Sequence, residues 1–490
     1  MFKIFVLGKH FIKKITLIIL IITTQFFFSC NTTETQTKDE VIENKIVKPT
    51  LLDKIKERGK LIAVTDYNST NYFVYRGTPM GYQYELLKSL AIQLDVKLVL
   101  EINNDLNQCF EGLNTGEYDI IALGLTITKE RNELVDFTIP ITQTRQVLVQ
   151  RKPDKWRKMK TYDEVEKHLI RNPLQLVGKT INIQKNTTFN SRLKNLSDEI
   201  GGNIFIIEDP EKEVEELITD VVNKDIDYTI CDEHIALVNE KYYPDIDVKT
   251  PISFQQNIAW AVKKGDSVFL TEINNWLANF NKSITSRYIY NKYFKNPRSV
   301  YIAKSQYHSI SGGKISRFDE EIKKQSKIID WDWRLIASLI YQESQFRENA
   351  KSWVGAFGLM QLMPNTANKY GVDSLSPPEE HIEAGVKFLK LLDKQFVKKI
   401  ENNRQRKKFV LASYNAGIAH VYDARRLAEK NNKDPNIWDE NVDFYLLNKS
   451  KPEFYRDPIV KYGYCRGEET YNFVSEIFER YEHYKNVIKN

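Results

Sequence analysis

Short apolar runs alternate with helical segments from about Leu51 to Lys264, and this alternation is typical of an α/β fold. The runs that predict strands of a first lobe are residues 61–64, 97–100, 119–122 and 146–149, with a helix over 84–94. Those that predict a second lobe are residues 179–183 and 227–230, and the run 258–262 is expected to return to the first lobe. Two lobes joined by crossing strands leave a cleft, where the ligands of open α/β sheets usually bind.

A later segment predicts a helix that carries a carboxyl group on its apolar side. Helical spacing places Leu335, Leu339 and Glu343 on one stripe, so Glu343 points toward the interior. Burial raises the pKa of a carboxyl group, because the charged form loses its hydration. A carboxyl that keeps its proton near neutral pH can act as a general acid. The alternative is a Glu at the edge of the core that is paired with a Lys or Arg.

Two polar motifs after this helix add groups that suit sugar binding. The glycine-containing run 355–358 predicts a tight loop where the backbone approaches another group closely. Gln361 follows among apolar residues, where its amide can hydrogen-bond a polar substrate. A helix over residues 410–416 brings the ring of Tyr414 for sugar stacking and the amide of Asn415 for an N-acetyl group.

Together these motifs resemble the lysozyme-like catalytic domain of the lytic murein transglycosylases. The motifs that carry the resemblance occur in that family's order and are Gln342-Glu343-Ser344, Gly355 to Pro364, and Ala412 to Gly417. The resemblance implies a mainly α-helical domain with Glu343 as the sole acid/base. It also implies that Gln361 and Asn415 bind sugar amides and that Tyr414 orients the substrate near the acid. Further candidates for positioning the acid or the substrate are Ser344, Ser352 and Met360.

A fourth motif of that family, E-T-x-x-Y-V, is altered in this chain. The corresponding run is Glu469-Thr470-Tyr471-Asn472-Phe473-Val474. Phe473 has no hydroxyl group, so a proton-positioning role for a Tyr at this place is in doubt, and Tyr471 falls on a different helical face. This motif, with the segment Tyr462 to Glu468 before it, resembles the membrane-bound branch of the family.

The expected chemistry follows from one carboxyl group without a partner. Two-carboxylate glycosidases need a second acid, and none stands in a motif, since Asp373 and Glu379 are expected to be solvated loop charges. The resemblance implies that Glu343 protonates the oxygen leaving the MurNAc–GlcNAc β-1,4 bond of peptidoglycan glycan strands. The MurNAc 6-hydroxyl then attacks, which gives 1,6-anhydro-MurNAc. No metal or cofactor is expected. The alternative is a peptidoglycan-binding receptor or scaffold with weak or no catalysis.

The first region resembles the family-3 periplasmic solute-binding proteins, in particular those that bind polar amino acids. The most specific pieces are Gly124 to Arg131 and Val135 to Pro140. The resemblance implies that Arg131 clamps a ligand carboxylate and that Asp232 holds an ammonium group, so an amino acid or a muropeptide is expected as ligand. Further ligand-binding candidates are Thr126, Thr187 at a helix N-terminus, and Tyr72 as a cover. The alternatives are a structural ion pair for Arg131 and a helix N-cap for Asp232.

The N-terminus predicts export and lipid anchoring. Lysines precede the apolar run Ile15 to Ile22, and Ser29-Cys30 follows, which is the pattern of a bacterial lipoprotein signal with Cys30 as the lipidated residue. Asn31 after that cysteine favours the periplasmic face of the outer membrane. The predicted organisation is a signal at 1–30, a flexible tether at 31–50, a solute-binding-like domain at 51–265, a connecting helical segment at 266–304 and a catalytic domain at 305–490.

Composition excludes other classes of function. A net charge of +6 is modest for 490 residues, and no nucleic-acid motif accompanies the basic run Lys398 to Lys408, so nucleic acid is not an expected partner. The cysteines Cys109, Cys231 and Cys465 have neither metal-ligand spacing nor the pattern of a disulfide framework, and they are expected to be buried.

Overall fold

A computed structural model describes residues 48–296, 302, 305–310 and 312–488. The predicted signal, Cys30 and nearly all of the tether lie outside the described residues. None of the helices in the described part of the chain combines the length and the apolar character needed to cross a membrane.

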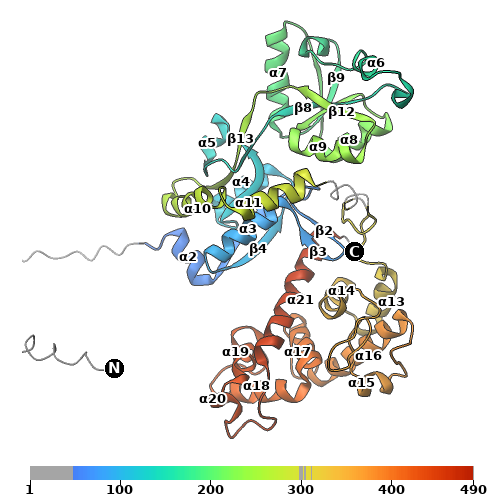
Figure 1. Cartoon of the computed structure of the whole chain (residues 1–490). Helices are drawn as coiled ribbons and strands as arrows, with labels where there is room; N and C mark the ends of the chain where they lie inside the picture. Colours follow the sequence, from blue (N-terminus) through green and yellow to red (C-terminus); the bar gives the residue numbers. More distant parts are fainter. Residues whose placement is uncertain (1–47, 297–301, 303–304, 311, 489–490) are drawn as a thin grey trace, which may run out of the picture. The chain divides into compact units, whose positions relative to one another are not determined.

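The first lobe is built on a sheet with the strand order β4-β1-β5-β13-β6, and β7 pairs with β13. Strands β1, β4 and β5 are parallel, whereas β13 runs antiparallel to β5. Figure 1 labels β4 and β13 of this lobe. The strands are β1 (Lys60–Thr65), β4 (Lys97–Ile102), β5 (Ile120–Thr126), β6 (Val135–Phe137), β7 (Thr142–Thr144) and β13 (Gln256–Lys263), with a hairpin of β2 (Phe73–Tyr75) and β3 (Thr78–Met80). Its helices are α2 (Leu51–Arg58), α3 (Tyr82–Gln93), α4 (Leu106–Thr115), α5 (Lys129–Leu134), α10 (Ser267–Phe280) and α11 (Ile284–Tyr290), and a π-helical turn, η3, spans Asn291–Lys295.

The second lobe has its own sheet, in the order β10-β9-β11-β8-β12. The strands are β8 (Gln146–Arg151), β9 (Thr180–Gln184), β10 (Phe205–Asp209), β11 (Tyr228–Asp232) and β12 (Ile246–Pro251). Its helices are α6 (Tyr162–Glu166), α7 (Thr188–Ile200), α8 (Val214–Asn223) and α9 (Glu233–Tyr242), with short 3₁₀ turns η1 (Trp156–Lys158) and η2 (Pro173–Leu176). The predicted return to the first sheet through residues 258–262 is confirmed, since β13 pairs there. Residues 146–149, predicted as a strand of the first lobe, instead form β8 of the second sheet, where β8 pairs with β11 and β12.

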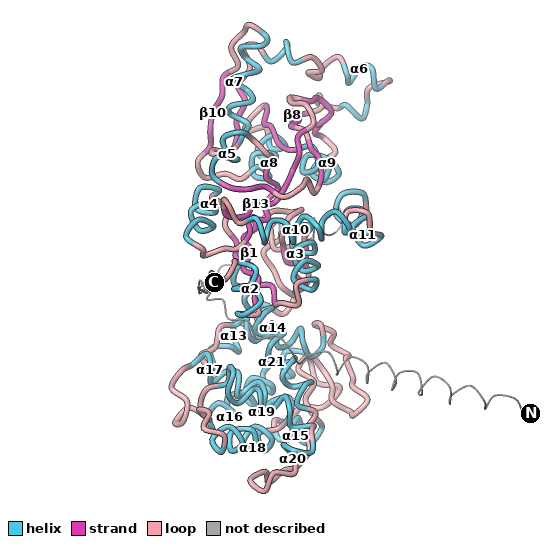
Figure 2. Tube along the Cα trace, turned by 90° about the vertical axis from the view of Figure 1, so that its left-hand side faces the viewer, coloured by secondary structure: helices cyan, strands magenta, loops and turns pink. Residues whose placement is uncertain are grey.

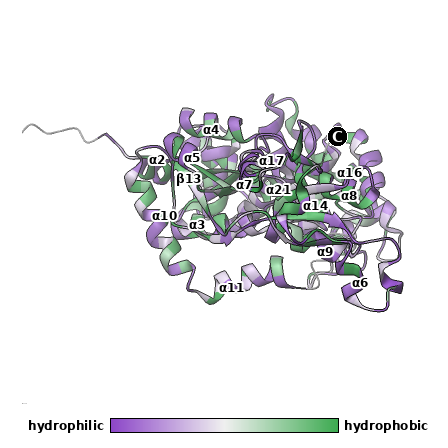
Figure 3. Cartoon of the chain, turned by 90° about the horizontal axis from the view of Figure 1, so that it is seen from above, coloured by the Kyte–Doolittle hydropathy of each residue, from purple (hydrophilic) through white to green (hydrophobic). Residues whose placement is uncertain are grey.

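The remaining part of the chain is helical, and Figure 2 draws it from α13 onward as helices and loops. Among the described residues, strands occur only in the two lobes. The helices are α13 (Asp319–Ile329), α14 (Trp333–Ser344), α15 (Pro364–Lys369), α16 (Pro378–Phe396), α17 (Asn403–Ala416), α18 (Ile418–Lys430), α19 (Asp443–Leu447), α20 (Pro452–Tyr455) and α21 (Gly467–Val487). Short π and 3₁₀ turns, η4 (Trp438–Val442) and η5 (Asn448–Ser450), flank α19. The helices are banded with hydrophobic and hydrophilic residues in Figure 3, as expected for helices that bury one side. The predicted fold class is confirmed.

Helix α14 places the predicted acid. Asp332 caps its N-terminus, because its carboxylate accepts a hydrogen bond from the Arg334 amide at 2.9 Å. Leu335 and Leu339 are fully buried in the core of the helical domain, which holds one side of the helix inward. The helix ends at Gln345, whose φ of 52° turns the chain away directly after the Glu-Ser pair. Glu343 therefore lies in the last turn, on the inward stripe.

Helix α21 belongs to the helical core and also contacts the β2–β3 hairpin of the first lobe. The Tyr484 hydroxyl donates to the carbonyl of Gly77 at 2.8 Å, and the Tyr72 hydroxyl lies 2.7 Å from Nδ1 of His483. Gly77 has a φ of 78°, and a Cβ there would lie 2.6 Å from the Tyr484 hydroxyl, so this close approach requires glycine. Residues 49–490 accordingly form one compact unit.

Candidate active site

Glu343 lines a cavity of about 600 Å³ in the helical domain, together with Ser352 and Gln361. Its side chain reaches this cavity but is packed by protein on most sides, and this burial raises the pKa of Glu343 from 4.5 to about 8. The carboxyl group therefore holds its proton at neutral pH and is able to donate it. This is the state that the inward-facing position in the helix predicts.

The glycine loop places Gln361 beside the acid. Gly358 has a φ of 76°, and a Cβ there would lie 2.2 Å from the ring of His381, so the turn needs glycine at this place. Nε2 of Gln361 donates to the carbonyls of Ala350 at 3.0 Å and Gly358 at 2.8 Å. Because both bonds use the amide nitrogen, the amide oxygen is the group that remains to accept a hydrogen bond from a substrate.

Tyr414 and Asn415 on α17 support the site without lining the cavity. The Tyr414 hydroxyl donates to the carbonyl of Met360 at 2.6 Å. Burial, and in second place the charge of Glu343, raises the pKa of Tyr414 well above its ordinary value, which places this ring near the acid. Oδ1 of Asn415 accepts a hydrogen bond from the hydroxyl of Thr470 at 2.7 Å, so the third motif is joined to the fourth.

The two candidate serines make hydrogen bonds within the protein. Ser344 is buried, and its hydroxyl donates to the carbonyl of Ile340 at 3.1 Å, in its own helix. The Ser352 hydroxyl accepts from the Ala356 amide at 2.9 Å and closes the loop that carries Gln361. Of the two, only Ser352 lines the cavity.

The altered position of the fourth motif is part of the core. Phe473 is 7% exposed and packs in the main hydrophobic cluster of the helical domain. Tyr471 is partly exposed and is not among the residues that line the Glu343 cavity, in agreement with its different helical face. Glu379, predicted in a loop, instead lies in the first turn of α16, where an acidic residue suits the helix dipole.

A second cavity of about 720 Å³ contains the residues predicted for ligand binding in the solute-binding-like region. Arg131, Asp232, Thr126 and Thr187 all line it. Nη1 of Arg131 donates to the carbonyl of Thr126 at 3.0 Å. Thr187 occupies the N-cap position of α7, and its hydroxyl donates to the Gln184 carbonyl at 2.8 Å.

Asp232 stands at the N-cap position of α9, yet its side chain makes no capping hydrogen bond. Its Oδ1 is buried and has no hydrogen-bond partner within the part of the chain that the structure describes. Burial raises the pKa of Asp232 to about 7, although Arg131 acts in the opposite direction. A buried carboxylate oxygen without a hydrogen-bond partner destabilises the folded protein, so Oδ1 is suited to accept a hydrogen bond from a bound ligand.

Tyr72, expected to cover the ligand, is fully buried and is not among the residues that line this cavity. Its hydroxyl is occupied by His483 of α21. The position of Tyr72 therefore links the first lobe to α21, which sequence spacing did not indicate.

Comparison with known proteins agrees with both regions. Residues 61–296 match the family "Bacterial extracellular solute-binding proteins, family 3", and residues 320–437 match "Transglycosylase SLT domain". The "Membrane-bound lytic murein transglycosylase F" of Desulfosudis oleivorans is 36% identical over 430 residues, which cover 88% of this chain and 90% of that protein. The protein of the same name from Pseudomonas fluorescens Pf-5 is 31% identical over 440 residues, which cover 89% and 87%. The chain belongs to this family.

The predicted resemblance to the membrane-bound transglycosylases is thereby confirmed. Among solved structures, an ancestral arginine-binding protein bound to arginine is 25% identical and covers 48% of this chain and 99% of that chain, with a TM-score of 0.41. The fold of the first region follows from its sheet topology and the family match.

Sequence reasoning missed four charged residues that share the cavity with Glu343: Arg317, Arg347, Glu348 and Lys351. Arg317 forms an ion pair with Glu348. The last three follow the Glu-Ser pair within eight positions, so their closeness in sequence was a usable signal. Arg317 lies before α13, and only the packing of the domain brings it to the site.

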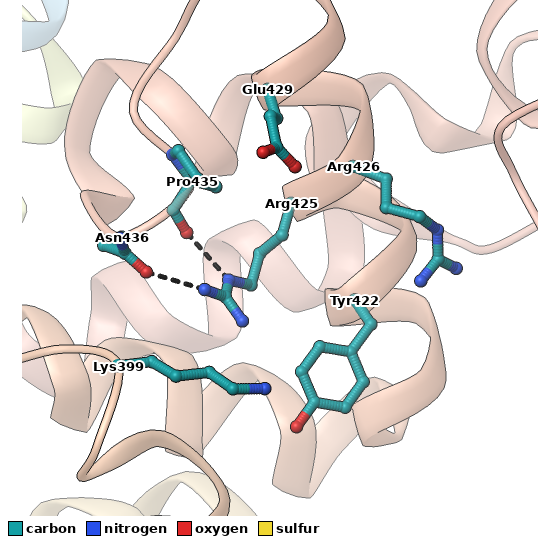
Figure 4. Close-up of a pocket in the computed structure, with 7 residues that line it drawn as sticks. All are labelled: Lys399, Tyr422, Arg425, Arg426, Glu429, Pro435 and Asn436. Carbon is teal, nitrogen blue, oxygen red and sulfur yellow. Dashed lines mark hydrogen bonds between the residues drawn. The ribbon is translucent and has the colours of Figure 1, made fainter.

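Figure 4 shows a separate basic pocket of about 390 Å³ in the helical domain. Its centre is the guanidinium of Arg425, which donates to the carbonyl of Pro435 at 2.8 Å and to Oδ1 of Asn436 at 2.6 Å. Lys399 lies 5.0 Å from the centre of the Tyr422 ring. None of the predicted site residues lines this pocket.

Proposed function

We propose that this protein is a lytic transglycosylase that cleaves the MurNAc–GlcNAc β-1,4 bond of peptidoglycan glycan strands and leaves 1,6-anhydro-MurNAc. The observation that carries the proposal is the raised pKa of Glu343, about 8, inside a cavity large enough for sugar residues. Membership of the lytic murein transglycosylase F family supports the choice of substrate. The role in the cell would be turnover and remodelling of the wall.

In the proposed reaction one group serves as acid and then as base. Glu343 donates its proton to the glycosidic oxygen, and the bond from that oxygen to the anomeric carbon of MurNAc breaks. The MurNAc acetamido group can stabilise the positive charge on that carbon. The Glu343 carboxylate then takes the proton of the MurNAc 6-hydroxyl, whose oxygen bonds to the anomeric carbon. Water is not consumed, and Glu343 regains its proton.

Hydrolysis is the competing reaction, because Glu348 lines the same cavity and would be the second carboxylate of a muramidase. Its ion pair with Arg317 favours a structural role instead. Mass spectrometry of digested peptidoglycan separates the two reactions, since anhydro ends are lighter than reducing ends by one water. Reducing-end MurNAc as the main product would refute the transglycosylase assignment.

The catalytic role of Glu343 is tested by the Glu343→Gln variant, whose amide cannot donate a proton as an acid does. We expect it to lose clearing of peptidoglycan in a zymogram. Glu379→Gln, an exposed side chain in the first turn of α16, is the matched control and should clear normally. Clearing that survives Glu343→Gln would refute Glu343 as the catalytic acid, whereas an unmodified protein that clears nothing would leave a peptidoglycan-binding receptor or scaffold as the better description.

We further propose that residues 51–265 bind a small ligand with an ammonium group, an amino acid or a muropeptide, and thereby modulate cleavage. The buried, unpartnered Oδ1 of Asp232 supports this proposal. Asp66, Glu213 and Glu215 line the same cavity, and burial raises the pKa of each of them, which an adjacent cation would reverse. Arg131 is the candidate partner for a ligand carboxylate.

Calorimetry with free amino acids and with stem peptides tests this ligand proposal. We expect heat of binding for ligands with a free ammonium group, and a loss of that heat in Asp232→Asn. Asp225→Asn, an exposed residue outside the cavity, is the control for the loss of one acidic group. If neither amino acids nor stem peptides bind, the region is a structural module.

We also propose that residues 1–30 are a lipoprotein signal and that a lipid on Cys30 holds the protein at the periplasmic face of the outer membrane. The sequence pattern and the membrane-bound names of the relatives support this. The tether at 31–50 and the helical segment at 266–304 complete the proposed organisation before the catalytic domain at 305–490. A Cys30→Ala protein that stays with the washed membrane fraction would contradict lipid anchoring.

A further inference from the structure

The cavity around Glu343 contains more positive charge than the protein itself neutralises. Arg317, Arg347 and Lys351 line it. Glu348 neutralises Arg317 in an ion pair. Arg347 and Lys351 have no acidic partner within ion-pair distance among the residues that the structure describes. With Glu343 protonated, two positive charges are therefore left over in the cavity.

Arg347 is held in place although its charge is free. Its backbone amide donates to the carbonyl of Ser344 at 3.0 Å, and Nε donates to the same carbonyl at 3.1 Å. This pair of bonds fixes the base of the guanidinium at the end of α14, and the two Nη groups remain to form a fork that fits a carboxylate.

The free cations do not act on Glu343. Burial alone accounts for the raised pKa of Glu343, whereas a cation in contact with that carboxyl group would lower the pKa. Their charge is therefore available to a bound molecule. A cleft lined by one sign of charge attracts ligands of the opposite sign.

In a peptide-bearing strand the sugar backbone does not supply that opposite charge, because the N-acetyl groups are neutral and the lactyl carboxyl group of MurNAc is bound to the peptide as an amide. The carboxylates of peptidoglycan belong to the peptide attached to the MurNAc lactyl group. We propose that Arg347 and Lys351 form a subsite that binds a carboxylate of this peptide, so that the enzyme prefers peptide-bearing strands to bare glycan. This inference rests on the proposed function and adds the part of the substrate that the predicted site residues do not contact.

The test compares cleavage of peptide-bearing strands with cleavage of strands whose peptides an amidase has removed and whose lactyl carboxylates, freed by the amidase, have then been converted to amides. In the unmodified protein we expect a higher kcat/KM for peptide-bearing strands, and a preference that falls as salt is added. Arg347→Gln and Lys351→Gln should each reduce the ratio of the two kcat/KM values by about three- to tenfold, the range for losing one partly exposed charge-assisted hydrogen bond. Cleavage of bare glycan should fall less than cleavage of peptide-bearing strands.

Two further variants separate a subsite from general charge attraction. Lys399→Gln removes the same charge from the other basic pocket (Figure 4) and should leave the ratio unchanged. Glu348→Gln releases Arg317 from its ion pair and should raise the ratio. The proposal is refuted if Arg347→Gln and Lys351→Gln leave the ratio unchanged, if they reduce cleavage of both substrates equally, or if Lys399→Gln reduces the ratio as much.

A binding measurement keeps the inference independent of the proposed reaction. In a Glu343→Gln background, co-sedimentation with insoluble peptide-bearing wall and with amidase-treated wall whose lactyl carboxylates have been converted to amides reports binding alone. We expect the protein to bind the peptide-bearing wall more tightly than the treated wall, and we expect Arg347→Gln to reduce this preference as it does in the cleavage assay. If the unmodified protein cuts neither substrate but shows this binding preference, the proposed reaction fails and the subsite stands. Equal binding to both walls would refute the subsite whatever the activity.

Discussion

Glu343→Gln should make the protein more stable, and increasingly so as the pH rises. The unfolded chain releases the proton of Glu343 near pH 4.5, whereas burial holds it in the folded protein up to a pKa of about 8. Between these values the folded state binds one proton more, so the free energy of unfolding falls as the pH rises, at about 1.4 kcal/mol per pH unit. Stability from this group is fully present below pH 4.5 and is lost as the pH rises toward 8.

Gln resembles the protonated Glu in shape and removes this loss. Applied to the two pKa values, the linkage relation predicts a gain of about 1 kcal/mol at pH 5, about 3 kcal/mol at pH 7 and about 4 kcal/mol at pH 8. Urea unfolding of both proteins at these three pH values measures it, with the transition of the helical domain followed separately, since a chain of several domains need not unfold in one step.

The exposed control Glu379→Gln should not gain stability with pH. A Glu343→Gln protein that is less stable than the unmodified protein would refute the argument that burial keeps Glu343 protonated. An increase in the free energy of unfolding that is the same at pH 5 and pH 8 would refute it as well. The variant is expected to be inactive as well, so stability and activity change in opposite directions, as is common where an active site holds a group in an unfavourable environment.

Two further predictions concern the stability of the helical domain. Gly358→Ala should destabilise the protein by about 1 to 3 kcal/mol and reduce clearing of peptidoglycan, because the added Cβ would clash with the ring of His381. The control is Gly355→Ala, which is also at positive φ but has open space around it and should lower the free energy of unfolding by about 1 kcal/mol. Lys449→Met should cost about 1.5 to 3 kcal/mol in urea unfolding, because it removes the buried charge-assisted hydrogen bond to Oδ2 of Asp423 at 2.6 Å, while Arg426 stays paired with Oδ1. A loss below about 1 kcal/mol would show that Arg426 and the backbone amides are sufficient to stabilise the Asp423 carboxylate.

Local patterns were sufficient for most of the secondary structure. The predicted run 61–64 lies in β1 and the run 258–262 lies in β13. Such strands can be predicted because a short apolar run between turn-forming residues is recognisable from neighbouring residues alone. The helix of Glu343 was predictable for the same reason, because its apolar stripe has helical spacing and two leucines of that stripe are fully buried. The basic run 398–408 crosses a boundary between two helices, since α16 ends at Phe396 and α17 begins at Asn403.

The sequence by itself determined which groups are present for the chemistry: one acid on an inward stripe, a glycine loop with Gln361, and a Tyr-Asn pair at the end of a helix. Only the tertiary structure decided which of these groups lie close together. It places Gln361 in the Glu343 cavity, sets Tyr414 behind it through the Met360 carbonyl, and brings Arg317 from before α13 to neutralise Glu348. The physical reason is that burial and the pairing of charges depend on residues far apart in the chain, so neither the raised pKa of Glu343 nor the unpaired charge of Arg347 is visible in a local pattern.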